Sequence, residues 1–206
     1  MFITFEGIEG CGKTTQLELL YSYLVKKGYK VVKTREPGGT PFGETLRDAF
    51  LHTGTKVDPF SELLLFMAMR AQHVEELIRP ALRKGSIVLC DRFADASYAY
   101  QGYGRGIDPN VIETLNGLTT KGIKPDLTIL LNCPVQKGLT RKARSAVMDR
   151  FEKEALSFHR RVKKAYEKLA KENAERFFVI DGTLDINSIQ KTIRKKVGGI
   201  LKHHGI

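Results

Sequence analysis

The sequence has few cysteines, no apolar run long enough to cross a bilayer, no internal repeat and no low-complexity linker. Its three cysteines, Cys11, Cys90 and Cys133, are widely spaced and odd in number. That pattern argues against a disulfide framework or a zinc site and favours reduced thiols in the cytoplasm. Cys90 and Cys133 lie in apolar runs and should be buried, whereas Cys11 lies in a loop and is a candidate reactive thiol.

The overall composition is that of an ordinary globular protein, with 42% hydrophobic and 28% charged residues in a chain of 206. We therefore expect a single domain over residues 1–206, in the cytoplasm and without a membrane segment. Because Met1 leads directly into a strand-like run, we expect no signal peptide.

Acidic residues are scarce relative to basic ones. The chain has 34 Lys and Arg against 23 Asp and Glu, which gives a formal net charge of +11. A protein that attracts highly charged anions gains from such an excess, and nucleic-acid binding is the alternative. The basic residues are mixed with Glu and apolar residues along helix-like segments, a pattern typical of solvated faces. We therefore expect no nucleic-acid partner.

Strand-like and helix-like segments alternate along the chain, which predicts an α/β fold with a parallel sheet covered by helices on both faces. The predicted strands are five: 2–6, 29–34, 86–91, 126–132 and 176–181. The predicted helices are 15–27, 42–51, 60–83, 109–119, 135–143, 152–173 and 185–202. Helix starts are expected at Ser61 and Asp185, and helix ends at Gly28, Gly85 and Gly122. Ligand sites should lie at the carboxyl ends of the strands.

The residues Gly7–Thr14 fit the phosphate-binding pattern G-x-x-x-x-G-K-[ST], between a predicted strand and a predicted helix. Glycines let the backbone N–H groups approach phosphate oxygens, and the helix start adds its positive dipole end. Lys13 can reach the β- and γ-phosphates, and the Thr14 hydroxyl can ligate Mg²⁺. The alternative is an ordinary glycine-rich turn. The expected ATP-binding residues are Gly7, Ile8, Glu9, Gly10, Cys11, Gly12, Lys13, Thr14 and Thr15.

Further polar residues follow the next two strands of the predicted sheet. Asp91 ends the strand 86–91 and is a second candidate Mg²⁺ ligand, while Arg92 is placed for a phosphate; a local Asp91–Arg92 ion pair is the alternative. The loop 34–41 is rich in proline and glycine and could form the wall of a second ligand site, with Arg47 on the helix that follows. A cis peptide bond before Pro37 or Pro41 is an open alternative.

The predicted helix 60–83 carries Leu64, Met67 and Ala71 at the spacing of a core face. Phe66 is a core residue or, less often, a platform for a base. Arg70 interrupts the apolar face and needs an anionic or polar partner if it is buried. The polar and aromatic segment 97–106 could line a pocket that reads a base, or it could be an exposed loop.

The segment 141–151 lies between two predicted helices and is rich in arginine. We interpret residues 141–150 as a short mobile lid that carries arginines over the phosphates, where they would stabilise the transferred phosphoryl group. A basic solvated loop is the alternative.

Taken in this order, the motifs are similar to those of the thymidylate kinase (dTMP kinase) family of the bacterial and archaeal kind. The matching stretches are 5–15, 34–40, 65–70, 91–93, 99–102 and 149–152. The phosphate-binding loop alone is shared by many families, but the set is specific, and the resemblance covers essentially the whole chain.

The resemblance implies roles for individual residues. Glu9 resembles the carboxylate that contacts the 3′-hydroxyl of the acceptor, and Tyr100 the tyrosine that excludes a ribose 2′-hydroxyl. Arg47 and Arg92 resemble the pair that binds the acceptor phosphate. The residues that resemble those around the thymine base are Phe66, which stacks on it, Arg70, which meets its edge, and Ser97 and Gln101 nearby.

Some members of this family place a catalytic arginine in the phosphate-binding loop and others place it in the lid. Here Gly10 follows Glu9, and the lid carries Arg141 and Arg144, so the chain resembles the lid-arginine type. Which of the two arginines touches the transferred group stays open, because Lys142, Ala143 and Ser145 make this lid poorer in arginine than related lids.

The resemblance implies transfer of the γ-phosphoryl group of ATP·Mg²⁺ to dTMP, giving ADP and dTDP, by a homodimer. The acceptor's nucleophile is an ionised phosphate oxygen, so no strong general base is needed; Lys13, Arg92 and a lid arginine are the expected catalytic residues. Two alternatives stay open, a kinase of another acceptor and a nucleotide-driven switch that binds nucleic acid.

Overall fold

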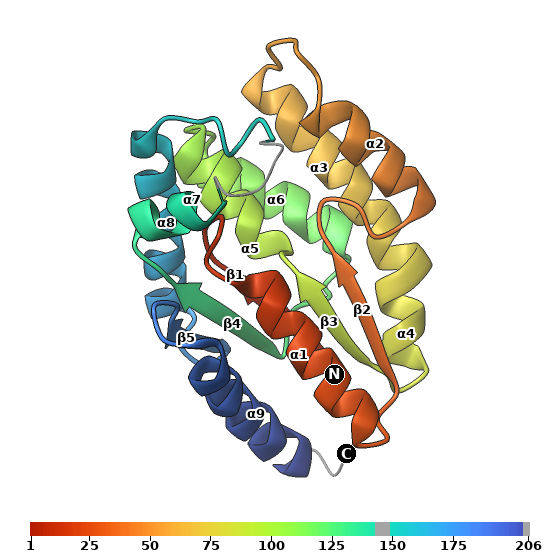
Figure 1. Ribbon diagram of the computed structural model, residues 1–206. Helices are drawn as coiled ribbons and strands as arrows, with labels where there is room; N and C mark the ends of the chain where they lie inside the picture. Colours follow the sequence, from red (N-terminus) through yellow and green to blue (C-terminus); the bar gives the residue numbers. More distant parts are fainter. Residues whose placement is uncertain (143–148, 204–206) are drawn as a thin grey trace.

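The computed structural model describes residues 1–142 and 149–203. A five-stranded parallel sheet forms its centre, with the strand order β2-β3-β1-β4-β5 (Figure 1). The strands are β1 (Phe2–Glu6), β2 (Val31–Arg35), β3 (Ile87–Asp91), β4 (Leu127–Asn132) and β5 (Phe177–Asp181). The predicted parallel sheet is therefore confirmed, and each strand boundary lies within two residues of the prediction.

Helices cover both faces of this sheet. The α-helices are α1 (Lys13–Lys26), α2 (Pro41–Leu51), α3 (Pro59–His73), α4 (Arg79–Arg83), α5 (Ala94–Ser97), α6 (Pro109–Thr120), α7 (Val135–Lys142), α8 (Leu156–Glu172) and α9 (Ile186–His203). Alternate residues of β3 show the two layers. Leu89 belongs to the same apolar cluster as Leu20 of α1, whereas Val88 packs in a separate cluster with Ile78 and Ala81.

The predicted helix 60–83 is present as a continuous helical segment, in which the π-helical turn η1 (Val74–Ile78) joins α3 to α4. Its predicted core face is only partly right, because Met67 is 3% exposed but Leu64 is 46% exposed. Its predicted start at Ser61 is wrong. Asp58 caps α3, since its side chain accepts hydrogen bonds from the backbone N–H groups of Phe60 and Ser61.

Other helix ends agree with the sequence. The Asp185 side chain accepts from the backbone N–H groups of Asn187 and Ser188 at the start of α9. The three glycines predicted to end helices, Gly28, Gly85 and Gly122, have the positive φ values of 90°, 72° and 79°.

Two helical predictions were wrong. The sequence predicts no helix in the segment 97–106, but the structure has α5 followed by the π-helix η2 (Tyr98–Gly104). Tertiary packing favours this helix: Gly104 lies so close to α8 that a Cβ there would be 2.6 Å from the Phe158 ring. The predicted helix 152–173 begins only at Leu156, because the Asp149 side chain accepts from the backbone of Glu152 and holds a turn before it.

The cysteines are reduced and buried. Cys90 and Cys133 are 0% and 1% exposed as predicted, but Cys11 is also only 1% exposed, which argues against a freely reactive thiol. Among the described residues, no helix is both long and apolar enough to pass through a membrane.

Candidate functional site

A cleft of about 1220 Å³ opens over the carboxyl ends of the strands. It is lined by the phosphate-binding loop and the start of α1, by the loop after β2, by α2 and α3, by the segment after β3, and by residues on both sides of 143–148. All but three of the predicted site residues line it. The backbones of Gly7 and Ile8 lie behind its wall, and Arg144 lies outside the described residues.

The phosphate-binding loop needs its glycines because other backbone segments touch it. A Cβ on Gly7 would lie 2.7 Å from the carbonyl oxygen of Leu131, and Gly7 has a φ of 135°. A Cβ on Gly10 would lie 2.0 Å from the carbonyl oxygen of Gly138 at the start of α7, and one on Gly138 would lie 2.4 Å from that of Glu9. The loop is therefore enclosed between β4 and α7.

The start of α1 is open to an anion. No side chain caps this end, where Gly12 has a φ of 100°, so the first backbone N–H groups are free for phosphate oxygens. Lys13 folds back and donates to the carbonyl oxygens of Gly7 and Ile8, at 3.0 and 2.8 Å. These contacts hold an ammonium group beside the loop, where a phosphate can replace the carbonyl partners.

Thr14 and Asp91 lie together at the base of the cleft. The Thr14 hydroxyl donates to Asp91 Oδ2 at 2.7 Å. Both side chains offer hard oxygen ligands, which suit Mg²⁺. Among the described residues there is no cluster of three or more His, Cys, Asp or Glu side chains that could hold a metal. The Thr14–Asp91 pair therefore fits a cation that takes its remaining ligands from phosphates and water.

Arg92 lies at the centre of the cleft with the unusual φ of 70°. Its Nη1 donates to the Gly7 carbonyl oxygen at 2.9 Å and to the Tyr166 hydroxyl at 3.2 Å. Its Nη2 donates to Glu9 Oε1 at 3.2 Å, and the guanidinium carbon lies 4.8 Å from the centre of the Tyr100 ring. Arg92 is thus paired with Glu9 across the cleft, which argues against a local Asp91–Arg92 pair.

Glu9 is buried beneath this arginine. Its Oε1 accepts from Arg92 and from the Tyr100 hydroxyl, and its Oε2 lies 3.2 Å from Nδ1 of His159. Burial on its own would raise the pKa of Glu9, but the contacts with His159, Arg92, Lys13 and Tyr100 lower it to about 2. Glu9 is therefore a carboxylate at neutral pH.

His159 was not among the residues predicted from the sequence. It is 0% exposed on α8 and reaches Glu9 from a helix more than a hundred residues away in the chain. Its position between Phe158 and Val162, on the apolar face of a helix, was the available signal.

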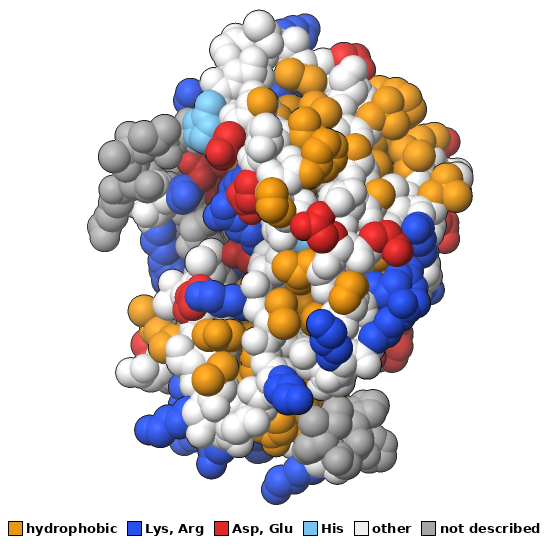
Figure 2. All heavy atoms as spheres, turned by 90° about the vertical axis from the view of Figure 1, so that its right-hand side faces the viewer, with side chains coloured by type: hydrophobic (Ala, Val, Ile, Leu, Met, Phe, Trp, Pro, Cys, Tyr) orange, Lys and Arg blue, Asp and Glu red, His pale blue; other side chains and the backbone are white. Residues whose placement is uncertain are grey.

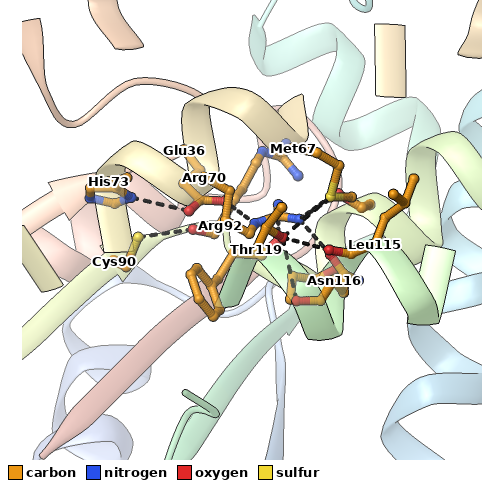
Figure 3. A network of polar contacts seen from close by, with 12 residues as sticks. Glu36, Met67, Arg70, His73, Cys90, Arg92, Leu115, Asn116 and Thr119 are labelled. Atoms are coloured by element: carbon orange, nitrogen blue, oxygen red, sulfur yellow. Dashed lines mark hydrogen bonds and ion pairs between the residues drawn. The ribbon is translucent and has the colours of Figure 1, made fainter. Parts of the chain in front are cut away.

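Arg70 is enclosed by polar partners from four segments (Figure 3). Its Nε donates to Glu36 Oε2 at 2.8 Å, its Nη1 to Ser97 Oγ at 3.0 Å and to Asn116 Oδ1 at 2.6 Å, and its Nη2 to the Phe93 carbonyl oxygen at 3.1 Å. The predicted need for an anionic partner is confirmed, and Glu36 is that partner. A ligand that contacts Arg70 has to share or replace one of these bonds.

Glu36 also contacts His73, whose Nδ1 lies 3.1 Å from Glu36 Oε1. Burial would raise the pKa of Glu36, but Arg70 and His73 lower it. The peptide bond between Glu36 and Pro37 is cis, as one of the open alternatives had it. Arg47 donates to the Pro37 carbonyl oxygen at 2.6 Å. Burial and the nearby Arg35 lower the pKa of Arg47, as expected for a cation that lacks a full set of anionic partners.

An aromatic wall closes one end of the cleft. Phe66 is 9% exposed and meets Phe50 edge to face, with ring centres 5.3 Å apart. Phe151, from the far side of 143–148, lies 6.0 Å from Phe66 and 5.6 Å from Tyr100. Phe66 is therefore at once a core residue and a part of the cleft lining, and Phe151 joins it, a residue that the sequence analysis did not single out.

Arg141 and Gln101 both line the cleft. Arg141, near the end of α7, donates to the Gly182 carbonyl oxygen at 3.1 Å. Gln101 is 2% exposed and donates to Glu62 at 2.9 Å. The geometry thus brings together an anion-binding loop, a candidate cation site and a second, mainly side-chain pocket, a combination suited to moving a phosphoryl group between two bound molecules.

Comparison with known proteins agrees with this geometry. The family model described as thymidylate kinase matches residues 5–193. The chain is 50% identical over 203 residues to a thymidylate kinase of Geotalea uraniireducens, with 95% of each chain covered. It is 48% identical over 204 residues to that of Halothermothrix orenii, with 98% of each covered. Its structure is similar to a crystal structure of thymidylate kinase from Ehrlichia chaffeensis, with a TM-score of 0.80, 39% identity, and 96% and 98% of the two chains covered.

Proposed function

The chain belongs to the thymidylate kinase family, and from that premise we propose that it transfers the γ-phosphoryl group of ATP to dTMP, giving dTDP and ADP. The observation that carries the proposal is the meeting of Lys13, Arg92 and Glu9 in one cleft, where the phosphate-binding loop faces a second pocket. The loop would bind the donor, and the second pocket would bind the acceptor.

The donor is assigned to the side of the cleft formed by residues 7–15. The free N–H groups at the start of α1 and the ammonium group of Lys13 are matched to the β- and γ-phosphates. The Thr14 and Asp91 oxygens would hold Mg²⁺. When bound there, Mg²⁺ supplies positive charge to the phosphate oxygens of the donor. Arg141 is assigned to the same side, and Arg144 stays a prediction outside the described residues.

The acceptor is assigned to the side-chain pocket. Arg47 and Arg92 offer guanidinium groups to its phosphate, and both are held by backbone carbonyl oxygens that an anionic ligand can outcompete. Glu9 and Tyr100 would meet the sugar. Phe66, Arg70, Ser97 and Gln101 would surround the base, of which only Phe66 offers a flat apolar face.

Catalysis in this arrangement rests on charge and position. The attacking group is a phosphate oxygen, which is largely ionised near neutral pH, so the chain needs to supply no strong base. Glu9 is unsuited to that role because its pKa is lowered to about 2. Arg92 is suited to neutralise the acceptor phosphate: burial would lower its pKa, yet Tyr100, Tyr166 and Glu9 raise it well above its usual value. Holding both phosphates in line removes much of the entropic barrier.

A kinetic assay tests the proposal directly. ADP release from ATP and Mg²⁺ is measured with dTMP, dUMP, the ribose analogue of dTMP, CMP, AMP or thymidine, against a blank without acceptor. We expect strong stimulation by dTMP, less by dUMP and almost none by thymidine, which lacks the phosphate for Arg47 and Arg92. Equal release with every acceptor would mean that the protein is an ATPase, and preference for another monophosphate would refute the assignment of the base pocket.

A homodimer is proposed as the working form, on an exposed apolar surface. Phe42, Phe60 and Leu64 are 51%, 48% and 46% exposed. Figure 2 shows hydrophobic side chains gathered on the face that carries α2 and α3. Apolar area of this kind on a monomer is typical of a subunit contact. Sedimentation velocity should give twice the chain mass, and Leu64→Glu should shift it to the monomer; a wild-type monomer at micromolar concentration would contradict the proposal.

The remaining assignments concern the chain as a whole. We propose that residues 1–206 act as a single kinase domain, with residues 141–150 as the lid, in the cytoplasm. The three cysteines without disulfide bonds support that location.

A further inference from the structure

Glu62 is a buried carboxylate that the proposed reaction does not use. It lies on α3, is 0% exposed and does not line the cleft. Its Oε1 accepts from Gln101 Nε2 at 2.9 Å and from Arg105 Nε at 3.2 Å, and its Oε2 accepts from Arg105 Nη2 at 3.1 Å. The two-pronged contact with Arg105 compensates the buried negative charge. What remains to be explained is its bond to Gln101, a residue of the cleft.

A glutamine side chain has two different ends. Its NH₂ group only donates hydrogen bonds and its carbonyl oxygen only accepts them, so a rotation of half a turn exchanges what the side chain offers. An ionised carboxylate accepts and cannot donate. As long as Glu62 is paired with Arg105, the NH₂ group of Gln101 has to face Glu62. The Gln101 Oε1 atom is then the end that is presented to the cleft.

We propose that Glu62 is a positioning residue that sets base selection by fixing the orientation of the Gln101 amide. The inference rests on the proposed function and on the assignment of the base to this side of the cleft. A fixed acceptor at Gln101 favours a base whose ring nitrogen N3 carries a hydrogen, as in thymine and uracil. It disfavours cytosine, whose N3 is itself an acceptor. Glu62 would thus control which hydrogen-bonding edge of the pyrimidine is accepted. The selection for or against the methyl group would be left to the aromatic wall.

The cost of the wrong base follows from unpaired groups. With the amide fixed, cytosine N3 would face the Gln101 carbonyl oxygen, and two acceptors would meet in a buried pocket with no hydrogen between them. If the amide were free to turn, its NH₂ group could meet the cytosine N3 instead. Buried sites built around one hydrogen-bonding pattern discriminate far more strongly than sites built around size, so loss of the fixed orientation should weaken discrimination.

The test compares two acceptors that share the methyl group and differ only at the pairing edge, dTMP and the 5′-monophosphate of 5-methyl-2′-deoxycytidine. The ratio of their kcat/KM values is measured for the wild type and for Glu62→Gln, whose amide can donate as well as accept. We expect the ratio to fall by about tenfold or more, the size of one lost hydrogen-bond preference. An unchanged ratio, with both acceptors slowed equally, would show a merely structural role and overturn the inference.

Glu154 provides a matched control. It contacts the same guanidinium from the other side, with Oε1 at 2.5 Å from Arg105 Nη1, but it has no bond to Gln101. Glu154→Gln makes the same chemical change in the same ion-pair cluster and should leave the ratio at the wild-type value. A fall equal to that in Glu62→Gln would assign the effect to the Arg105 cluster in general and overturn the role of Glu62.

Two further variants keep the test decisive. In Gln101→Leu the amide is gone, so adding Glu62→Gln should change the ratio no further; an additional tenfold fall would overturn the coupling. If Glu62→Gln fails to fold, Glu62→Asp decides. It keeps the negative charge but draws the carboxylate back by one methylene from Gln101 and Arg105 alike, so the ratio should again fall, and a wild-type ratio would overturn the inference.

The two proposals fail in different ways. A wild-type protein that does not phosphorylate dTMP refutes the proposed function. A wild-type protein that does, with a ratio unaffected by Glu62→Gln and Glu62→Asp, refutes only the role of Glu62.

Discussion

The two halves of the cleft are built in different ways. We assign one half of the cleft to the donor and the other to the acceptor. The donor half consists of backbone, in which the first N–H groups of α1 have no side-chain cap and the loop is confined by the backbones of Leu131 and Gly138. The acceptor half consists of side chains from several separate segments, and their polar atoms already bind one another. In the donor half, the backbone hydrogen-bond donors have no partner among the described residues. In the acceptor half, the charged side chains are paired with one another.

This difference determines how each half binds a ligand. A backbone loop is ready for phosphate, since its donors have no partner to give up. A side-chain pocket of paired charges is held together by those same pairs, so a ligand must exchange its own groups for existing contacts. The acceptor half thus combines recognition with stability, and substitutions there should disturb both. In the loop, whose glycines are fixed by close backbone contacts, the Lys13 side chain should matter mainly for catalysis.

The largest effect is expected from Lys13→Ala, which removes the charged side chain of the donor half. Turnover in the ADP-release assay should fall by at least about 10³-fold, because a lost electrostatic contact to the transferring group cannot be replaced by water. The free energy of unfolding should change by much less than the activation free energy, since the hydrogen bonds of the Lys13 ammonium group among the described residues are to its own loop. Lys26→Ala, an exposed residue at the other end of α1, is the control. Normal turnover in Lys13→Ala would remove the loop from the mechanism.

The acceptor half should respond in stability as well as in recognition. Glu36→Gln leaves the buried Arg70 without its anionic partner, and removal of one member of a buried ion pair costs about 3–5 kcal/mol. Urea unfolding measures this loss in the free energy of unfolding. The control is Glu18→Gln, whose partner Lys33 is 44% exposed and whose loss should cost less than about 1 kcal/mol. Equal effects of the two would contradict the difference between buried and exposed pairs.

The effect of Glu36 should also depend on pH. Its pKa in the folded protein is lowered below the usual 4.5, since Arg70 and His73 outweigh burial. A lowered pKa stabilises the fold above the unfolded-state value and ceases to do so as the pH falls through the folded-state value. The difference in the free energy of unfolding between wild type and Glu36→Gln should therefore become smaller in acid. A difference that stays constant down to pH 3 would contradict this prediction.

Glu6, the last residue of β1, should give the opposite dependence of stability on pH. Burial and Asp95 raise its pKa to about 8. Between pH 4.5 and 8 the folded protein therefore binds a proton that the unfolded chain has lost, and stability falls as the pH rises. Glu6→Gln removes this dependence, so the slope should flatten by up to about 1.4 kcal/mol per pH unit relative to wild type. Urea unfolding from pH 5.5 to 8 measures both slopes, and parallel slopes would refute the shift.

The smallest effect is expected from Tyr100, whose ring packs on Phe151 and whose hydroxyl donates to Glu9. In Tyr100→Ala the preference for dTMP over its ribose analogue should narrow by about tenfold, a discrimination typical of steric fit. Tyr100→Phe, which keeps the ring and loses the hydroxyl, should keep most of the preference if exclusion is steric. A ratio unmoved in Tyr100→Ala would refute the exclusion of the 2′-hydroxyl.

The same contrast explains how much could be predicted from sequence. The phosphate-binding loop is one contiguous motif between a strand and a helix, so its position could be predicted directly, as could the five strands; the roles of its residues stay predictions. The acceptor half depends on partners that lie far apart in the chain: Arg92 and Glu9 are separated by 83 residues, and Tyr100 and Glu9 by 91. No local pattern connects them. The end of a predicted strand indicated a phosphate role for Arg92, and only the family resemblance indicated roles for Glu9 and Tyr100.

The residues and the helical segment that were not predicted from the sequence share one cause. His159 and Glu62 are buried polar residues on helices, where a pattern of apolar spacing reads them as core neighbours or solvated positions. The helical segment α5–η2 was missed because its inward face carries Ser97, Tyr100 and Gln101, so burial there does not produce an apolar stripe. Polar side chains that line a pocket therefore remove the apolar stripe by which their helix could be predicted from the sequence.

The close approach of Gly10 and Gly138 limits which side chains position 10 can carry. A side chain at position 10 would have to occupy the place of the Gly138 carbonyl group, so Gly10→Arg could not convert this protein to the type with an arginine in the phosphate-binding loop. The start of α7 would have to move first. An arginine at position 10 of this chain would therefore require a backbone rearrangement in addition to the substitution.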